Sequence, residues 1–521
     1  MMSTSEANPL RAHASTAESA AARPRRRHCA AVSVAAAVLL LLPFAAVNVV
    51  PSTDVPQLMA QLVLLEDRGG GEEFTVQWWH PNKLGYLPLA FGRWTGTSGL
   101  ELVVLAWIAS FFLVARRRER SAAHAALASA LVFNISFHWG FVNFLLGAPL
   151  FVLWIDSVDR DFATPDRPPS NRQGLAFLVL GILLYAAHVL WLAVALLWLA
   201  AEATRRRSIS QLLRRLAWLA PVLAAVVAWY AFFRETGVDQ RLFWGQMPWQ
   251  RLHPGWWVES LFGGLRGRAE PALAIAILLW IGLGLIQHRH EPGFGADRAL
   301  RNAGLLLLVL AFTLPAVYHH TILFAARWMA PAVALLVLAA PSPRLSPALR
   351  GGVPWVLAAS LSIAITAGWL RFQGELAGFH EGLEAIGHSQ AADPQDVRVL
   401  GLDFVRESEH LDGYPFHHLP AYAQVHFGAR LHRTFADDPA SLVVFKQLPH
   451  VYPWTDRLDW SPEKLRQSDF DHFDLFFVNA PPQLHGRFLA DPRLQPTDDT
   501  AARDDAPWRL YRILPKPAVR E

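Results

Sequence analysis

Apolar runs of about 17–25 residues, the length of a helix that crosses a bilayer, recur along the first 372 residues of this chain. Short clusters of arginine, such as residues 25–27 and 116–118, separate these runs. Only 17% of the 521 residues are charged, whereas soluble proteins carry about 25%. The pattern argues against a soluble, disordered or fibrous protein, and it predicts a polytopic α-helical membrane protein.

Arginine clusters remain on the cytoplasmic side of a membrane and so orient the spans between them. As a single helix, the run at 174–201 would put arginines 205–207 outside, so we expect two short helices broken near His188. The run at 122–155 is too long for one span, and we expect it to break at residues 138–140. One topology satisfies every cluster, with about eleven spans, the N-terminus inside and the C-terminus outside. The expected spans are 29–50, 100–115, a hairpin within 122–155, a hairpin within 174–201, 216–233, 272–287, 303–318, 321–340 and 353–372.

The distribution of charge divides the chain at residue 372. Residues up to this point carry 32 basic and 20 acidic groups, and the remainder carry 15 basic and 23 acidic groups. We expect a cytoplasmic disordered N-terminus at 1–28, a transmembrane domain at 29–372 with an outer loop at 51–99, and an extracytoplasmic soluble α/β domain at 373–521. In the last domain, Ser461-Pro462 is typical of a helix start. Strand-like segments there are 397–402, 442–445, 474–478 and 508–512.

Acidic residues after the first span are the catalytic candidates. Asp54 follows that span directly, and the apolar spacing within 57–67 predicts a helix along the membrane surface. A carboxylate at the rim of the bilayer can act as a general base toward a hydroxyl acceptor. The alternative is that Asp54 only caps the surface helix. Glu66 and Asp67 are further catalytic candidates, and a solvated loop edge also explains them.

Basic residues and imidazoles on the outer side are the substrate-binding candidates. Arg327 lies six residues into the span at 321–340, hence ~9 Å from its outer end. A guanidinium matches phosphate geometry, and an arginine that reaches the outer interface is the alternative. Cys29 stands alone, which excludes a cysteine metal motif, and no other cofactor is indicated. A divalent metal held by imidazoles stays open beside plain interfacial residues. The other candidates are His80, Lys83, His138, His188, His319 and His320.

Five features occur together here: Asp54 just after the first span, a first outer loop with a surface helix, a short hairpin at 134–147, Arg327 within a span, and an outer α/β domain. In this combination the chain resembles the GT-C-fold glycosyltransferases, the bacterial multi-span relatives of the protein mannosyltransferases. Members of that family often carry paired acidic residues in the first outer loop. Here Asp54 stands beside Ser52-Thr53, and the nearest acidic pair is Glu66-Asp67.

The resemblance implies an enzyme of the hexosyltransferase type on the outer face of the bacterial inner membrane. Its donor is a polyprenyl-phosphate-linked sugar, and its acceptor is a glycan, a lipid or a protein. Asp54 would deprotonate the acceptor hydroxyl, and Arg327 or a basic residue of an outer loop would neutralise the departing lipid phosphate. The charge pattern does not favour a nucleic-acid partner. Two alternatives stay open: a transporter or flippase of envelope lipids or glycans, and a non-catalytic envelope scaffold whose tail binds a partner.

Overall fold

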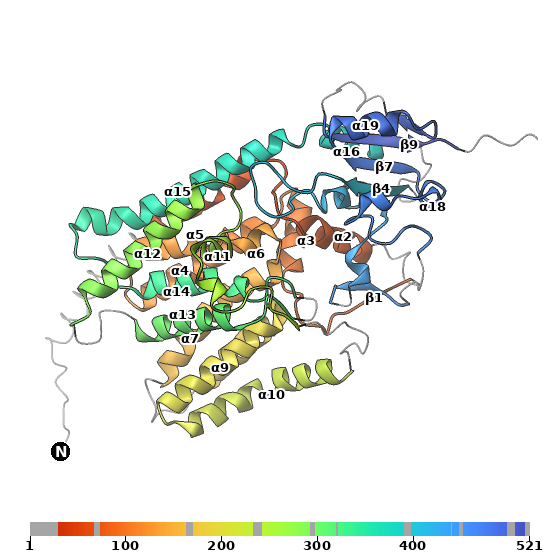
Figure 1. Cartoon of the computed structure of the whole chain (residues 1–521). Coiled ribbons are helices and arrows are strands. Elements are labelled where there is room, and N and C mark those ends of the chain that lie inside the picture. The colour runs from red at the N-terminus through yellow and green to blue at the C-terminus, as the bar shows by residue number, and fades with distance from the viewer. Residues whose placement is uncertain are drawn as a thin grey trace, which may run out of the picture.

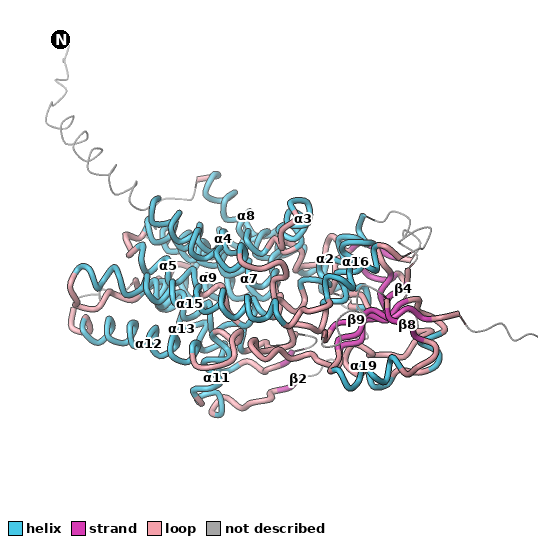
Figure 2. The backbone as a smooth tube through the Cα atoms, turned by 90° about the horizontal axis from the view of Figure 1, so that it is seen from above, coloured by secondary structure: helices cyan, strands magenta, loops and turns pink. Residues whose placement is uncertain are grey.

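The computed structural model describes residues 30–66, 73–162, 170–232, 242–291, 297–318, 321–389, 397–438, 440–447, 452–497 and 506–515. Helices form a long body, and the C-terminal strands gather at one end of it (Figure 1). A view from above places these strands at the same end (Figure 2). Two helices, α2 (Val55–Glu66) and α3 (Tyr86–Thr95), lie where the body meets the strands.

The apolar run at 122–155 folds as three consecutive helices, which are α5 (Ala122–Ala130), α6 (Ile135–His138) and α7 (Val142–Phe162). Asn134 begins α6, because its side-chain oxygen accepts the N–H of Ser136 at 2.8 Å. Gly140 has a φ of +80°, which turns the chain toward α7. The break predicted at residues 138–140 is therefore confirmed, and the run also breaks at residues 131–134, which was not predicted.

The run at 174–201 also breaks where the arginine clusters required it. α8 (Asn171–Ala187) ends and α9 (Val189–Arg205) begins on either side of His188, whose backbone is extended. The His188 Nδ1 accepts the N–H of Leu190 at 3.3 Å and so caps α9. Two short helices at this position were predicted, and the prediction is confirmed.

Buried tryptophans join the central helices of the body, which include α4 (Leu100–Arg117). The indole N–H of Trp107 in α4 donates to the carbonyl of Leu145 in α7 at 2.9 Å. Trp191 in α9 donates to Phe144 in α7 at 2.8 Å. An unpaired buried N–H costs about 1–3 kcal/mol. These bonds therefore favour the packing of α4 and α9 against α7, where the indole N–H groups find carbonyl partners.

Four of the described helices are both long and apolar enough to cross a membrane, judged by length and composition alone. They are α7, α10 (Ile209–Phe232), α12 (Ala269–Gln287) and α15 (Pro347–Gly374). Exposed apolar side chains cover much of α10, α12 and α15, a pattern that marks contact with lipid or a partner. Shorter apolar helices span Ala30–Ala45, Val55–Glu66, Asn171–Ala187 and Ala326–Ala339. The described part of the chain is thus mostly helical and contains four such helices, so it does not clearly show the eleven expected spans.

The segment expected as a span at 321–340 begins later than predicted. Leu323 has a φ of +53°, which a helix does not accommodate, and the Phe324 N–H bonds back to Ala316 at 2.8 Å. Regular structure starts with the 3₁₀ turn η4 (Ala326–Trp328) and continues as α14 (Met329–Ala339). The expected depth of Arg327 was wrong, because this residue lies in the first turn of the segment.

The C-terminal region contains a five-stranded mixed sheet with the order β5-β4-β7-β9-β8. β4 pairs in parallel with β5 and β7, and β9 is antiparallel to β7 and β8. The strands expected at 397–402, 474–478 and 508–512 are confirmed as β4, β7 and β9. A 3₁₀ turn, η8 (Pro462–Lys464), follows Ser461, whose side chain makes no cap. The bounds are β4 (Arg398–Asp403), β5 (Arg430–Leu431), β7 (Leu475–Asn479), β8 (Leu494–Pro496) and β9 (Trp508–Ile513).

The strand expected at 442–445 exists as β6 (Val443–Phe445), but it does not join the five-stranded sheet. It pairs in antiparallel fashion with β1 (Phe74–Val76), which follows α2 in the chain. The Val443 N–H also donates to the Gln61 side chain on α2 at 2.7 Å. Main-chain hydrogen bonds therefore fasten the C-terminal region to the segment that follows α2.

The remaining described elements complete the body and surround the sheet. These elements are β2 (Leu242–Phe243), η2 (Gln250–Leu252), α11 (Pro254–Leu261), α13 (Arg298–Thr313), β3 (Val317–Tyr318), α16 (Phe379–Gly387), η6 (Leu419–Ala421), α17 (Tyr422–Phe427), η7 (Phe435–Asp437), α18 (Gln467–Phe470) and α19 (Pro482–Leu489). α16 packs Phe379 against Phe477 of β7, and α19 packs Phe488 against Tyr511 of β9.

A cluster of ion pairs lies at the far end of α7 from Gly140. Arg118 pairs with Asp156, Asp159 and Asp297 at 2.9–3.1 Å, and only 1% of the Asp156 side chain is exposed. A cavity of about 460 Å³ opens beside this cluster. Asp159 is separated from the start of α7 by about 25 Å of helix, so this cavity is remote from Asp54.

Candidate functional site

Asp54 sits at the start of α2, where backbone bonds hold it against the tip of the hairpin. The Thr53 N–H donates to the carbonyl of His138 at 2.9 Å, and the Asp54 N–H donates to that of Trp139 at 3.1 Å. Gly140 lies so close that an added Cβ would be 2.9 Å from the Asp54 nitrogen. The hairpin tip therefore fixes the backbone from which the Asp54 carboxylate projects.

The Asp54 carboxylate faces the C-terminal region. Its Oδ1 is 3.3 Å from Nδ1 of His418, which also lies 3.2 Å from the Thr53 carbonyl oxygen. Burial raises the pKa of Asp54 to about 7, against the lowering effect of the nearby Arg327 and Arg433. Because 20% of its side chain is exposed, the carboxylate is still accessible to a ligand.

Arg327 is the second charged group of this site. Only 6% of the residue is exposed, and its guanidinium carbon lies 3.5 Å from the centre of the Phe141 ring. Its Nε has no hydrogen-bond partner among the described residues. Asp54 and His188 are its charged or titratable neighbours. A buried cation of this kind attracts an anionic group.

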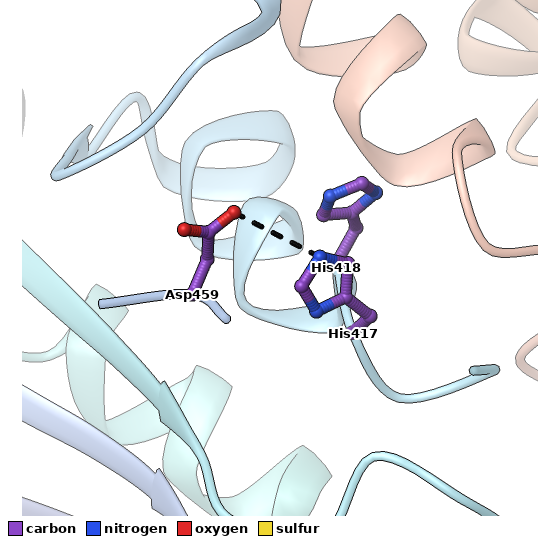
Figure 3. Close-up of side chains that lie close together, drawn as sticks. All are labelled: His417, His418 and Asp459. Carbon is purple, nitrogen blue, oxygen red and sulfur yellow. Dashed lines mark ion pairs between the residues drawn. The ribbon is translucent and has the colours of Figure 1, made fainter. Parts of the chain in front are cut away.

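His418 also belongs to a group of three buried side chains, together with His417 and Asp459. The ligand atoms of His417, His418 and Asp459 all lie within 4.8 Å of one another (Figure 3). The His417 Nε2 is 3.8 Å from Asp459 Oδ2, which also forms an ion pair with Arg433. Burial lowers the pKa of His417 to about 2 and that of His418 to about 3. Both imidazoles are therefore neutral, the form that binds a metal.

A small cavity of about 10 Å³, close to the space that one water molecule needs, connects this group with the sheet. Asp403 lines it from the last position of β4, opposite Asn479 at the end of β7. The Asn479 side chain donates to Asp403 Oδ1 at 2.9 Å, whereas Asp403 Oδ2 has no hydrogen-bond partner among the described residues. Burial raises the pKa of Asp403 well above its ordinary value. Parallel strands commonly present functional groups at this carboxyl edge.

The predicted residues divide into those that the structure brings together and those that it does not. Asp54 and Arg327 share one site, the His138 backbone supports it, and His188 lies beside Arg327. Glu66 is at the far end of α2, about 18 Å along the helix, where it pairs with Arg93 at 2.8 Å. It is not brought to Asp54.

His80 and Lys83 lie next to the break between α8 and α9 rather than beside Asp54. The Lys83 N–H donates to the Ala186 carbonyl at 2.7 Å, and its Nζ donates to Ala440 at 2.6 Å. Burial lowers the pKa of Lys83 to about 7 and that of His80 to about 4. Asp67, His319 and His320 lie outside the described residues.

The histidines predicted to lie together on the outer side are not the ones that cluster in the structure. The residues that do cluster come from the C-terminal region, and none of them was predicted from the sequence: they are His417, His418, Arg433 and Asp459. The adjacent pair His417-His418 was the one visible signal, but its partner Asp459 is distant in sequence and lies in no motif.

The arrangement offers a partly exposed carboxylate, a buried cation and a set of neutral imidazoles at one end of the helical body. These groups can accept a proton, bind an anion and ligate a metal. They lie between the start of α2 and the carboxyl edge of the sheet. Comparison with protein-family models, with curated proteins and with solved structures finds no match for this chain.

Proposed function

We propose that the chain is a membrane glycosyltransferase, which moves a sugar from a polyprenyl-phosphate-linked donor to an acceptor on the outer face of the bacterial inner membrane. The observation that carries the proposal is that Asp54 lies among His418, Arg327 and Arg433. A carboxylate next to cations suits a reaction that takes a proton from an alcohol and releases a phosphate.

Asp54 is the proposed general base. It takes the proton of the acceptor hydroxyl while the acceptor oxygen forms a bond to the anomeric carbon of the sugar. The bond between that carbon and the phosphate oxygen breaks, and polyprenyl phosphate leaves with the electron pair. His418 holds the carboxylate through Nδ1 at 3.3 Å, so the side chain is positioned before the acceptor arrives.

Arg327 is the proposed phosphate-binding residue. Its stacking on Phe141 fixes the plane of the guanidinium. The Nε, which has no hydrogen-bond partner in the described part of the chain, supplies a donor for a phosphate oxygen. The negative charge that grows on the leaving phosphate strengthens this interaction in the transition state.

The proposed membrane arrangement has about eleven spans, with the N-terminus cytoplasmic and the C-terminal region outside. The four long apolar helices support it, as do the arginines that gather with aspartates at the far end of α7. The lipid tail of a polyprenyl donor remains in the bilayer, so its phosphate reaches the rim where Asp54 lies. This explains why the reactive groups belong at one end of the helical body.

Sugar transfer in membrane vesicles tests the proposal. Vesicles that contain the full chain receive a panel of radiolabelled undecaprenyl-phosphate hexoses, and label in membrane acceptors is measured. We expect Asp54→Asn to lower transfer about 10²–10⁴-fold, the usual contribution of a general base, and Arg327→Gln to lower it as well. Glu66→Gln is the matched acidic control, because Glu66 is exposed and paired with Arg93, and it should keep full transfer. If wild type transfers sugar and Asp54→Asn transfers it equally well, Asp54 has no part in the mechanism. If wild type transfers sugar from none of the donors, the proposed function is refuted.

A further inference from the structure

The side chains of His417, His418 and Asp459 have the spacing of metal ligands. Two ligand atoms about 2.1 Å from a tetrahedral ion are about 3.4 Å apart. The His417 Nε2 and Asp459 Oδ2 are 3.8 Å apart, and all three ligand atoms lie within 4.8 Å. Small rotations of the side chains therefore bring three donors onto one centre (Figure 3).

The hydrogen bonds of His418 determine which of its nitrogens is free. Its Nδ1 faces two acceptors, the Thr53 carbonyl at 3.2 Å and the Asp54 carboxylate at 3.3 Å, so Nδ1 carries the proton. Nε2 then has the lone pair, and it is buried without a hydrogen-bond partner among the described residues. A histidine whose far N–H is held by a carboxylate or carbonyl is the usual form of a metal-bound histidine.

His417 supplies an independent observation. Only 4% of the residue is exposed, and neither ring nitrogen has a hydrogen-bond partner among the described residues. A buried polar group without a partner costs about 1–3 kcal/mol, and a metal bound through one nitrogen would remove this cost there. Its ring packs on Trp460 with 4.0 Å between the ring centres, which limits its rotation away from Asp459.

We propose that His417, His418 and Asp459 bind one divalent transition-metal ion between α2 and the C-terminal sheet. Two imidazoles and one carboxylate are a donor set that zinc accepts, and three protein ligands leave a fourth position open for water or a substrate oxygen. The small cavity beside the cluster is lined by the Asp403 carboxyl, which can hydrogen-bond a ligand in that position. Arg433 holds the Asp459 carboxylate in place by its ion pair.

Metal binding by the purified full chain tests the site, with zinc and cobalt(II) as the probes. The protein is purified in detergent, treated with a chelator, dialysed and loaded. Wild type should retain about one equivalent of zinc, rise in melting temperature on loading, and give visible absorption with cobalt(II) typical of a four-coordinate site. His417→Gln and Asp459→Asn should each lose this equivalent and the zinc-dependent rise.

The matched control is His485→Gln. His485 is fully buried in the same C-terminal region, but both its nitrogens have partners, the Tyr511 hydroxyl at 2.8 Å and the Pro507 carbonyl at 2.9 Å. It should keep the zinc equivalent. If wild type retains no more zinc per chain than Asp459→Asn does, the proposed metal site is refuted. If His417→Gln does not fold, Asp459→Asn alone decides, because an amide preserves the shape of the carboxyl group.

The metal site goes beyond the proposed function and is measured without sugar transfer. Zinc binding in a chain that transfers no sugar would refute the glycosyltransferase alone. Sugar transfer by a wild-type chain that retains no zinc would refute the metal site alone.

Discussion

Replacing Gly140 by alanine tests how the hairpin tip positions Asp54. Gly140 has a φ of +80°, and a side chain in the left-handed region costs about 1–2 kcal/mol. The new Cβ would also lie 2.9 Å from the Asp54 nitrogen and 3.0 Å from that of Val55, and overpacking of this kind costs about 1–3 kcal/mol. We expect Gly140→Ala to lower the free energy of unfolding by about 2–5 kcal/mol.

Gly96 provides the matched control. Its φ is +75° and it also follows a helix, but nothing lies within 4 Å of an added Cβ. Gly96→Ala should therefore lower the free energy of unfolding only by the backbone cost of about 1–2 kcal/mol. Denaturant titration of the detergent-solubilised variants, followed by tryptophan fluorescence, measures both changes. Equal losses in the two variants would refute the reasoning that contact with Asp54 makes Gly140 special.

Two further changes address buried charge. Burial lowers the pKa of Lys83 from 10.5 to about 7. Between these pH values the unfolded chain binds more protons than the folded chain, so stability should rise with pH in that window. Lys83→Met should flatten the dependence of melting temperature on pH, and parallel curves for the variant and wild type would contradict this. Arg118→Gln removes one of the positive charges that compensate the buried Asp156 carboxylate, and it should lower the free energy of unfolding by about 3 kcal/mol in denaturant titration. Arg266 pairs with Glu407 at an exposed position, so Arg266→Gln should lower it by less than about 1 kcal/mol. Similar losses in both variants would show that burial does not determine the contribution of an ion pair.

Local features of the fold could be predicted from the sequence. The break at His188 followed from the arginine clusters, since a single helix would have carried them to the wrong side. Short runs rich in strand-forming residues located β4, β7 and β9. The partner of β6 was out of reach, because a strand pattern does not contain the identity of the strand it pairs with. The start of the helix at Arg327 was missed because it depends on the positive φ of Leu323.

The candidate site could be predicted only in part. Asp54 and Arg327 were found because ionisable residues in apolar surroundings are conspicuous. His417, His418 and Asp459 lie in a polar region where such residues are common, so composition does not distinguish them. All three side chains are buried, and among the described residues ring nitrogens of the two histidines have no hydrogen-bond partner. Both properties arise only from tertiary packing. Glu66 was grouped with Asp54 by sequence proximity, although Asp54 precedes the first residue of α2 and Glu66 is the last of its twelve residues.

The pairing of β1 with β6 has a consequence for biogenesis. His418 and Thr53 are 365 positions apart, and at ribosomal rates of about 5–20 residues per second this interval takes roughly 20–70 s. During that time the start of α2 has left the ribosome while its partner His418 has not been made. Asp54 and the hairpin tip are then exposed to any other strand or ligand that reaches them. Pairing of β1 with β6 ends this interval, so the site is completed only after the helical body has been made.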